Sequence, residues 1–477
     1  MESVKIRNFM EITYEQLEEL NLAAKRKMLE HADEQEIAEQ MLKYLADERQ
    51  IKAVTIAFSD IEGRFHMLDF DKKFLLRARD ELTFDGSSIR GFAVQQESDL
   101  RLSVDWPSFR WLPSDIFGAG KVMVFGLIRD RGGRPYEADL RGRLKAWCQE
   151  IWDRDRSVAD TAVEVEGFLF QGMGAEQGFL PHEGFRFVSE GGYFHSLPLT
   201  PLKQFIDRFA EAQRAMGFEN EKDHPEVAPS QFELNYTYCD SLVAADQIQL
   251  YKLLARQIAA SMGYTASFLP KPRVNINGSG MHTNISMSRA GENLMFDGSA
   301  ADGLSELGRS MARRLLHAAG ELCLVMNSSV NSYRRLDPAF EAPNQIRASA
   351  VDRTAMIRIP LNSRRAARLE VRSVAPDANP YMLLLALFRT ALEGTDPGPE
   401  AIERDLGSLP DNIHAAIDLF ERSELLAAIL GRESRDKYAA LKKATADRCP
   451  KELGTRIKSG EVLFHHEVCN QHIWAQF

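Results

Sequence analysis

Three short segments, far apart in the sequence, alternate charged or polar side chains with apolar ones. They are residues 163–166 (VEVE), 281–286 (MHTNIS) and 368–372 (RLEVR). Successive side chains of a strand point to opposite faces, so each segment, as a strand, has one polar and one apolar face. Three such strands predict a sheet that packs its apolar face into a core and turns its polar face toward an enclosed, funnel-shaped site.

Length and composition limit the class of protein. With 477 residues the chain is longer than one ordinary core supports, so we expect two domains, one much larger than the other. The net charge of −10, with dispersed basic residues, argues against nucleic acid as the main partner. The five cysteines have no paired spacing, so we expect neither a disulfide framework nor a zinc site. No run approaches the roughly 20 apolar residues of a membrane span, and we expect a cytoplasmic protein that neither enters a membrane nor is secreted.

The order of the patterns predicts an α+β fold in three parts. We expect a helical segment at residues 1–48, a small sheet domain at 49–130 and a large domain at 131–477, with the boundary at the turn-rich segment 130–135 (DRGGRP). In the large domain, strands predicted at 162–170, 231–238, 281–286, 355–359 and 368–373 alternate with helices at 140–154, 201–216, 244–262, 304–324 and 380–392. Residues 327–343 are turn-rich, which is typical of a functional loop.

Acidic residues from several segments form a candidate metal site with one histidine. The six candidate ligands are Glu164, Glu166, Glu226, Glu233, Glu370 and His282. Carboxylates packed closely raise one another's pKa unless cations neutralise them. Oxygen ligands with one imidazole suit Mg²⁺ or Mn²⁺, and six ligands are more than one protein-bound Mg²⁺ normally uses, so we expect two or more ions. The alternatives are a solvated strand face for each glutamate pair and a purely structural role for His282.

Arginines crowd into the forty residues that also hold Glu341 and Glu370. They are Arg334, Arg335, Arg353, Arg358, Arg364, Arg365, Arg368 and Arg372. The guanidinium group matches carboxylate and phosphate in bidentate geometry, so this cluster beside a metal site indicates phosphoryl transfer. The alternative is surface ion pairing. Neither GxxxxGK[ST] nor GxGxxG occurs, so a nucleotide site must belong to another class.

Eight motifs, in order between about residues 48 and 392, resemble glutamine synthetase of the bacterial type (type I). They are FDGSSIRGF (84–92) with a downstream ESD, ExE followed by FLF (164–170), GGYF (191–194), HPEVAPSQFE (224–233), KPRVNINGSGMH (271–282), NSYRRLDPAFEAP (331–343), DRTAMIRIP (352–360) and RLEVRSVAPDANPYM (368–382). The resemblance implies a small N-terminal β-grasp-like domain and a large catalytic domain on a curved antiparallel sheet. It also implies a homo-oligomer, usually a dodecamer of two hexameric rings, with each active site between two subunits.

The implied reaction is the ATP-dependent ligation of ammonia to the γ-carboxylate of L-glutamate through γ-glutamyl phosphate, giving glutamine, ADP and phosphate. By position, one metal ion would lie among Glu166, Glu226 and Glu233 and the other among Glu164, His282 and Glu370. Glutamate or the transferred phosphoryl group would be bound by Asn277, Gly278, Arg335, Arg353 and Arg372. The ATP site would include Glu221, Asn284, Ser286, Arg353, Arg358, Arg365 and Arg368. The catalytic set would be Asp85 and Ser88 of a neighbouring subunit with Tyr193, Glu341 and Arg353, where Asp85 deprotonates ammonium and Glu341 closes over the intermediate.

Several positions depart from the family pattern but leave all six metal-ligand positions unchanged. The departures are Asn284, Asp352, Arg365, Pro225, Phe232 and Gly167, together with the C-terminal segment 465–477 (HHEVCNQHIWAQF). No tyrosine occurs between Tyr381 and Tyr438, so we do not expect control by adenylylation. A γ-glutamyl-amine ligase, which uses an organic amine, is the alternative enzyme, and a weakly active nitrogen-sensing relative is the alternative from another class. The retained Asp85, Ser88 and Tyr193 favour ammonia.

Overall fold

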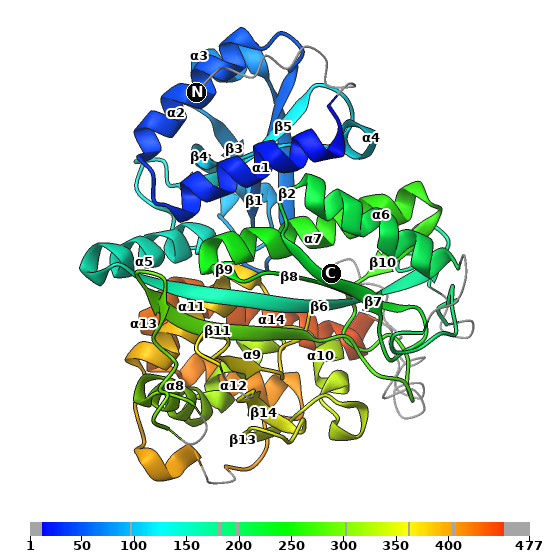
Figure 1. Ribbon diagram of the computed structural model, residues 1–477, viewed down its shortest axis with the longest axis vertical. Helices are drawn as coiled ribbons and strands as arrows, with labels where there is room; N and C mark the ends of the chain where they lie inside the picture. The colour runs from blue at the N-terminus through cyan, green and yellow to red at the C-terminus, as the bar shows by residue number, and fades with distance from the viewer. Residues whose placement is uncertain are drawn as a thin grey trace.

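The computed structural model describes residues 12–452, except 96–97, 180–183, 196–199, 301–302, 361–362 and 403–405. A small domain lies at one end of the molecule, above a larger domain crossed by the two long strands β6 (Ser157–Gln171) and β11 (Met281–Arg289) (Figure 1). The C-terminal segment 465–477, which departs from the family pattern, lies outside the described residues.

The small domain is built on a five-stranded sheet in the order β2-β1-β5-β4-β3. Its strands are β1 (Ala53–Ser59), β2 (Phe65–Asp71), β3 (Thr83–Asp85), β4 (Asp99–Trp111) and β5 (Lys121–Arg129), with the helices α3 (Lys72–Ala78) and α4 (Ser114–Phe117). Strands β1 and β5 are parallel and the other pairs are antiparallel. The predicted N-terminal helices form as α1 (Tyr14–Leu29) and α2 (Glu34–Asp47), which pack against β4. The segment 130–135 is a tight turn, since Arg129 bridges to Pro135.

The large domain is built on a ten-stranded sheet whose main path is β13-β14-β15-β11-β6-β8-β7. Its remaining strands are β7 (Asn220–Pro225), β8 (Gln231–Tyr236), β9 (Cys239–Asp240), β10 (Tyr264–Ser267), β12 (Glu292–Asn293), β13 (Gln345–Ser349), β14 (Ala355–Arg358) and β15 (Leu369–Val371). Strands β13 and β14 are parallel, so the sheet is mixed rather than wholly antiparallel as the resemblance implied. The polar and apolar alternation of the sequence is thus placed on one continuous sheet.

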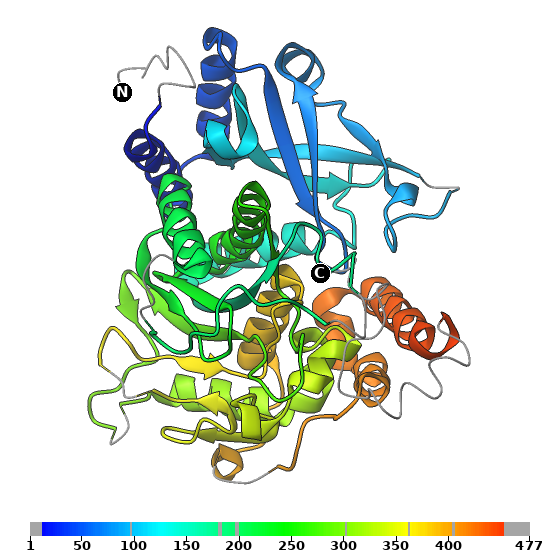
Figure 2. The ribbon, with the colours of Figure 1, turned by 90° about the vertical axis from the view of Figure 1, so that its right-hand side faces the viewer.

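Helices pack around this sheet, and most lie where the sequence predicts them. They are α5 (Leu140–Asp155), α6 (Pro201–Ala215), α7 (Ser241–Ser261), α8 (Glu306–His317), α9 (Ala319–Met326), α10 (Val330–Arg335), α11 (Pro380–Glu393), α12 (Ile413–Arg422), α13 (Glu424–Leu430) and α14 (Arg432–Glu452). Figure 2 shows the C-terminal helices, coloured orange to red, beneath the small domain. Among the described residues, none of the helices is both long and apolar enough to cross a membrane.

One predicted helix and one predicted turn-rich segment differ in detail from the structure. The predicted single helix at 304–324 is two helices, because Ala318 leaves helical geometry with ψ near 8° and ends α8. The turn-rich segment 327–343 contains the short helix α10, which Ser329 and Ser332 begin with a reciprocal capping box. The core runs without interruption through both domains and has a smaller satellite around Phe168 and Phe170.

Candidate active site

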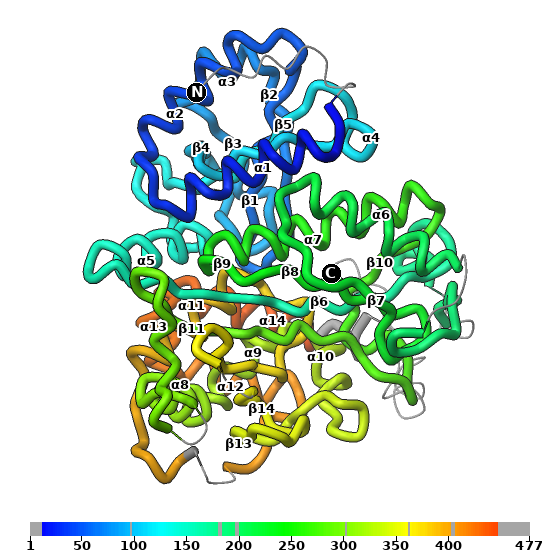
Figure 3. The backbone as a smooth tube through the Cα atoms, viewed as in Figure 1, coloured from blue at the N-terminus to red at the C-terminus, as the bar shows by residue number. Residues whose placement is uncertain are grey.

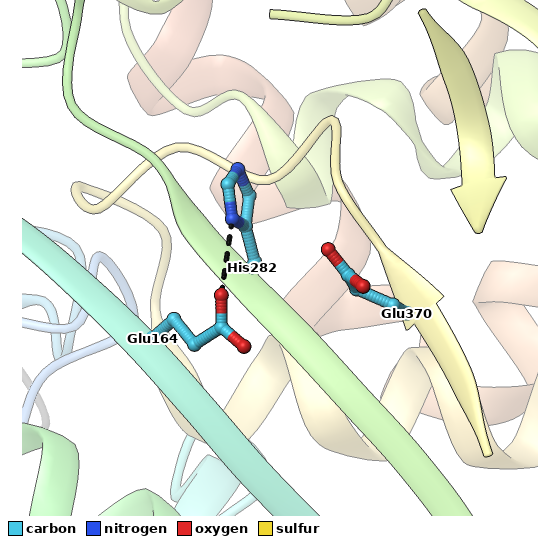
Figure 4. Close-up of side chains that lie close together, drawn as sticks. All are labelled: Glu164, His282 and Glu370. Carbon is cyan, nitrogen blue, oxygen red and sulfur yellow. Dashed lines mark hydrogen bonds and ion pairs between the residues drawn. The ribbon is translucent and has the colours of Figure 1, made fainter. Parts of the chain in front are cut away.

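Three adjacent strands bring one half of the predicted ligand set together. Register places His282 of β11 opposite Glu164 of β6, and places Glu370 of β15 opposite Asn284 of β11. The ligand atoms of Glu164, His282 and Glu370 lie within 4.8 Å of one another, and the three side chains point toward a common centre (Figure 4). His282 Nδ1 lies 3.4 Å from Glu164 Oε2. The sequence-based grouping of these three residues is therefore reproduced in space.

A second group forms where β7 leads into β8. It consists of His224, Glu226 and Glu233, whose ligand atoms also lie within 4.8 Å of one another. His224 Nε2 is buried, lies 3.8 Å from Glu233 Oε1 and has no hydrogen-bond partner among the described residues. His224 was not among the residues predicted from the sequence as metal ligands; it is in β7, and Glu226 follows directly after the end of that strand.

Glu166, predicted for this second group, lies beside it rather than in it. It is paired across the strands with Glu233, and its Oε2 accepts hydrogen bonds from the Gly280 amide (2.8 Å) and from Gln231 Nε2 (3.1 Å). Gln231 also donates to the carbonyl of Gly278. Gln231 thus joins the carboxylates to the segment before β11, a role that the sequence analysis did not assign.

The carboxylates are crowded enough to change one another's pKa. Burial, followed by the charge of Glu166, raises the pKa of Glu226 to about 8. Burial and the charges of Glu166 and Glu164 raise the pKa of Glu233 well above its usual value. Burial opposes ionisation of Glu164 as well, but the hydrogen bond and charge of His282 lower its pKa to about 2. Hard oxygen donors with imidazole nitrogen and excess negative charge fit divalent cations such as Mg²⁺ or Mn²⁺.

Arginines border the first metal-site group. Glu370 is 1% exposed and pairs with Arg372 Nη1 at 2.6 Å and with Arg358 Nη1 at 2.8 Å. Arg335 is also buried, donates from Nη2 to the Arg372 carbonyl at 3.2 Å and has no hydrogen-bond partner for Nη1 among the described residues. A Cβ at Gly280 would lie 2.6 Å from Arg335 Nη2 and 3.0 Å from His282 Nε2, so a side chain there would displace the Arg335 guanidinium.

A loop residue from the turn-rich segment meets two predicted glutamate-site residues. Glu341 has a left-handed backbone (φ 60°) and accepts a hydrogen bond from Asn277 Nδ2 at 2.7 Å. Arg353 Nη1 lies 3.8 Å from the other carboxylate oxygen of Glu341. The Glu341 side chain is about half exposed and the Arg353 side chain about two-thirds exposed, which leaves both accessible at the mouth of the site.

The residues predicted for ATP are only partly gathered. Arg368 Nε donates to Asn284 Oδ1 at 2.7 Å, and Asn284 Nδ2 donates to Glu164 Oε1 at 3.3 Å, so this departure from the family pattern connects an arginine to the metal-site group. Ser286 lies further along β11. Glu221 and Arg365 are exposed and make no hydrogen bond or ion pair with another described residue.

Another departure, Asp352, is engaged within its own loop. Its carboxylate pairs with Arg347 and accepts hydrogen bonds from the amide and hydroxyl of Thr354 at 2.8 and 2.7 Å. Asp352 therefore fixes the turn that precedes β14 and leaves the neighbouring Arg353 free to reach Glu341.

The residues predicted for the amine acceptor come from two places. Asp85 and Ser88 are on the small domain, where Asp85 accepts hydrogen bonds from Ser87 and Ser88 that hold its pKa below the usual range. No hydrogen bond or ion pair joins Asp85 to the described residues of the large sheet. Tyr193, in the large domain, stacks on Phe194 with 3.8 Å between ring centroids, and both rings meet His224 edge to face.

This arrangement, two carboxylate–histidine groups with arginines on one face of a curved sheet, is typical of enzymes that use divalent cations to bring anions together. The family models described as the glutamine synthetase β-Grasp domain and catalytic domain match residues 50–127 and 137–455. The chain belongs to the glutamine synthetase family.

The chain is similar to known glutamine synthetases over most of its length. It is 33% identical to that of Staphylococcus aureus (strain MRSA252) over 424 residues, which cover 83% of this chain and 92% of the relative. It is 32% identical to that of Thermotoga maritima over 438 residues, covering 88% and 98%. The family comprises ligases that form carbon–nitrogen bonds and bind ATP and divalent metal ions.

Solved structures confirm the predicted fold. A GmaS/ADP complex, in which GmaS is a γ-glutamylmethylamide synthetase, has a TM-score of 0.76 and 27% identity, and the match covers 89% of this chain and 99% of that one. Glutamine synthetase of Plasmodium falciparum has a TM-score of 0.77 and 20% identity over 88% and 98% of the chains, a likeness of fold alone. The predicted β-grasp and catalytic domain architecture is therefore correct.

Proposed function

We propose that this protein ligates ammonia to the γ-carboxylate of L-glutamate, with ATP converted to ADP and phosphate. The observation that carries the proposal is the pair of carboxylate–histidine groups, Glu164 with His282 and Glu370, and His224 with Glu226 and Glu233, the first of which borders the buried Arg372. Two anions, the substrate carboxylate and the γ-phosphate of ATP, must meet for γ-glutamyl phosphate to form. Positive charge fixed on both sides of that approach supplies most of the catalysis in such a transfer.

In this proposal the two carboxylate–histidine groups each hold a divalent ion. Glu164, His282 and Glu370 hold one, while Glu226 and Glu233, with His224 or Glu166, hold the other. Bound Mg²⁺ or Mn²⁺ supplies Lewis acidity and neutralises the phosphate oxygens. The protein contributes a fixed set of oxygen and imidazole donors.

The arginines orient the two substrates. Arg335 and Arg372 would bind the phosphoryl group being transferred, which is supported by the buried Nη1 of Arg335, a donor with no hydrogen-bond partner in the part of the chain that the structure describes. Arg358 and Arg368 would bind the nucleotide. Each guanidinium stays positively charged at any working pH, so the anionic substrates are always attracted to these side chains.

Closure of the Glu341 loop protects the intermediate. Water would hydrolyse an acyl phosphate, so a residue that covers the site and then accepts a proton from the attacking nitrogen serves two purposes. Glu341 is suited to this because Asn277 and Arg353, both assigned to the glutamate site, already contact its carboxylate.

The acceptor site is completed by a second copy of the chain. Asp85 and Ser88 lie on the small domain, and their hydrogen bonds keep Asp85 ionised so that it attracts ammonium. With Tyr193 and Glu226 of the facing copy it would form an acidic pocket in which ammonium loses its proton. The proposal therefore includes a homo-oligomer, a dodecamer by analogy with the family, working in the cytoplasm.

One observation favours a second candidate, a γ-glutamyl-amine ligase. Tyr193 and Phe194 are more than half exposed, stacked on each other and next to His224, which belongs to the same group as Glu226. Aromatic faces beside carboxylates suit an alkylammonium ion as well as ammonium. The similarity to GmaS supports the same alternative, whereas the unchanged metal-ligand positions argue against a weakly active nitrogen-sensing relative.

The test is an ATP-dependent assay with L-glutamate, Mg²⁺ and one acceptor at a time: ammonium, methylamine, ethylamine or putrescine. We expect amide formation with ammonium that falls at least about 100-fold in Asp85→Ala. Asp80→Ala, which removes an exposed carboxylate of the same domain paired only with Arg79 at 3.7 Å, is the matched control and retains activity. Turnover with an alkylamine but not with ammonium would replace this proposal with the amine ligase.

A further inference from the structure

The C-terminal helix α14 lies against the loop that carries Asp85 and Ser88, although more than 340 residues separate them in the sequence. Figure 3 labels α14, which lies behind the long strands β6 and β11 in that view. The loop begins with the 3-10 turn Gly86–Ser88 and continues to Phe92. The start of the loop is held within the small domain, because Asp85 pairs with Asp99 of β4 and the Gly86 amide donates to the Ser98 carbonyl at 2.7 Å, while Ser87 and Ser88 donate to the Asp85 carboxylate.

Side chains from both partners attach the loop to the helix. Arg90 Nη2 donates to Thr445 Oγ1 at 3.2 Å and to the Leu441 carbonyl at 3.4 Å. From the helix, Lys437 Nζ donates to the Phe92 carbonyl at 3.2 Å. The two attachments involve Arg90 and Phe92, the residues on either side of Gly91, so the helix holds both neighbours of Gly91.

Gly91 is where the helix and the loop backbone come closest. It has φ +81°, and a Cβ there would lie 2.4 Å from Leu441 Cδ1. Both the left-handed backbone and the close approach require glycine. The leucine of α14 therefore occupies the space that a side chain at position 91 would fill.

A buried ion pair anchors the same helix to the small domain at a second point. Lys442 Nζ lies 2.9 Å from Glu62 Oε1 in the turn between β1 and β2, and both side chains are at most 5% exposed. Arg90 Nε lies 4.0 Å from the other oxygen of Glu62. Arg90 thus contacts both the helix and the residue to which the helix is anchored.

We propose that α14 is a positioning element for the acceptor site: through Lys437 and Thr445 it holds the loop 86–92 and thereby fixes Asp85 and Ser88 for the amine. The inference rests on the proposed function for the identity of the substrate. A loop that must reach a reacting nitrogen in another subunit loses binding and rate when its position varies by even about 1 Å, so preorganisation by a helix matters.

The variants that test this proposal lie on the helix, far from the reacting groups. Thr445→Val removes the hydroxyl that accepts from Arg90, and Lys437→Met removes the bond to Phe92. Lys443→Met is the control, since Lys443 is on the same helix but is half-exposed and pairs with Glu421 at 2.7 Å. We expect KM for the acceptor amine to rise about three- to tenfold in each test variant, the usual effect of one lost hydrogen bond, while KM for glutamate and ATP stays within about twofold. The control matches the wild type in all three constants.

A second readout does not depend on catalysis. Amide hydrogen exchange of residues 86–92 speeds up in Thr445→Val and Lys437→Met, but not in Lys443→Met, if α14 holds the loop. Arg90→Met reproduces the faster exchange and Arg90→Lys restores part of the protection.

Two results would overturn the inference. One is unchanged loop exchange in both helix variants. The other is a rise in all three KM values together, which would mark a general structural loss. If the wild type makes no amide from any acceptor, the proposed function fails, while the exchange experiment still decides whether α14 positions the loop.

Discussion

Arg141 is the residue whose replacement we expect to cost the most stability. It is 1% exposed on the side chain and lies between Asp105 of the small domain and Asp246 of α7. Its Nε and Nη2 donate to the two oxygens of Asp246 at 2.8 and 2.7 Å, and Nη1 forms an ion pair with Asp105 Oδ2 at 2.7 Å. Arg141→Met keeps most of the side-chain volume and removes only the charge and the donors.

The magnitude follows from what remains after the replacement. Asp105 keeps Lys145 at 2.7 Å, but Asp246 keeps only the Tyr381 hydroxyl at 2.8 Å and is left as a buried anion without a cation in hydrogen-bond contact. Removing one partner of a buried pair typically costs about 3–5 kcal/mol. We therefore expect the free energy of unfolding to fall by about that amount.

The assay is guanidinium denaturation followed by tryptophan fluorescence, with comparison of midpoint and slope. Arg143→Met is the control, because Arg143 lies half a turn further along α5, is about one-third exposed, and contacts only Glu137 in the described residues, its carbonyl at 2.9 Å and its carboxylate at 3.8 Å. That variant should lose less than about 1 kcal/mol. The double variant Arg141→Met with Asp246→Asn should recover part of the loss. Equal and small effects of Arg141→Met and Arg143→Met would refute the argument.

Three further predictions concern the pH dependence of stability, the space beside Gly280 and the loop that carries Glu341. Burial raises the pKa of Asp160 from 3.8 to about 6. The folded state then binds the proton more tightly than the unfolded state does, so the free energy of unfolding falls as pH rises from about 4 to 6. Asp160→Asn should remove about 3 kcal/mol of this fall, seen as a smaller difference between unfolding curves at pH 4 and 7.5; identical pH dependence would contradict it. Gly280→Ala places a Cβ 2.6 Å from Arg335 Nη2 and should reduce amide formation at least about 100-fold. Gly298→Ala, whose Cβ would lie 3.5 Å from Phe296, should leave the activity unchanged, and equal rates in both variants would rule out the steric argument. Asn277→Ala frees Glu341 and should raise the ratio of phosphate released to amide formed, measured on the same samples, and an unchanged ratio would show that the Asn277 contact does not support closure.

The local patterns of the sequence predicted the strands of the site well. Side-chain alternation is set within a few residues, so the shared face of His282 and Asn284 follows from β11 alone. The grouping of Glu164 with His282 and Glu370 was predicted from the family resemblance. Local patterns could not predict it, because the strands that carry these residues are more than 80 residues apart in the sequence.

Other features depend on tertiary contacts that no local pattern encodes. His224 was missed because a single histidine before a proline resembles a turn residue until β7 pairs with β8. Arg365 was assigned to the ATP site by the family resemblance, yet it is exposed, and its role stays a prediction. The break between α8 and α9 falls at Ala318, and the nearby Gly320 is itself inside α9, so apolar periodicity alone predicted one helix.

The most direct test of the central claim is a count of the Mn²⁺ ions bound per chain, by titration calorimetry with electron paramagnetic resonance of the free ion. The account predicts at least two ions in the wild type. Glu370→Gln should lose the one held with Glu164 and His282, and Glu226→Gln should lose the other. A wild type that binds no Mn²⁺, or variants that keep the full count at unchanged affinity, would contradict the account.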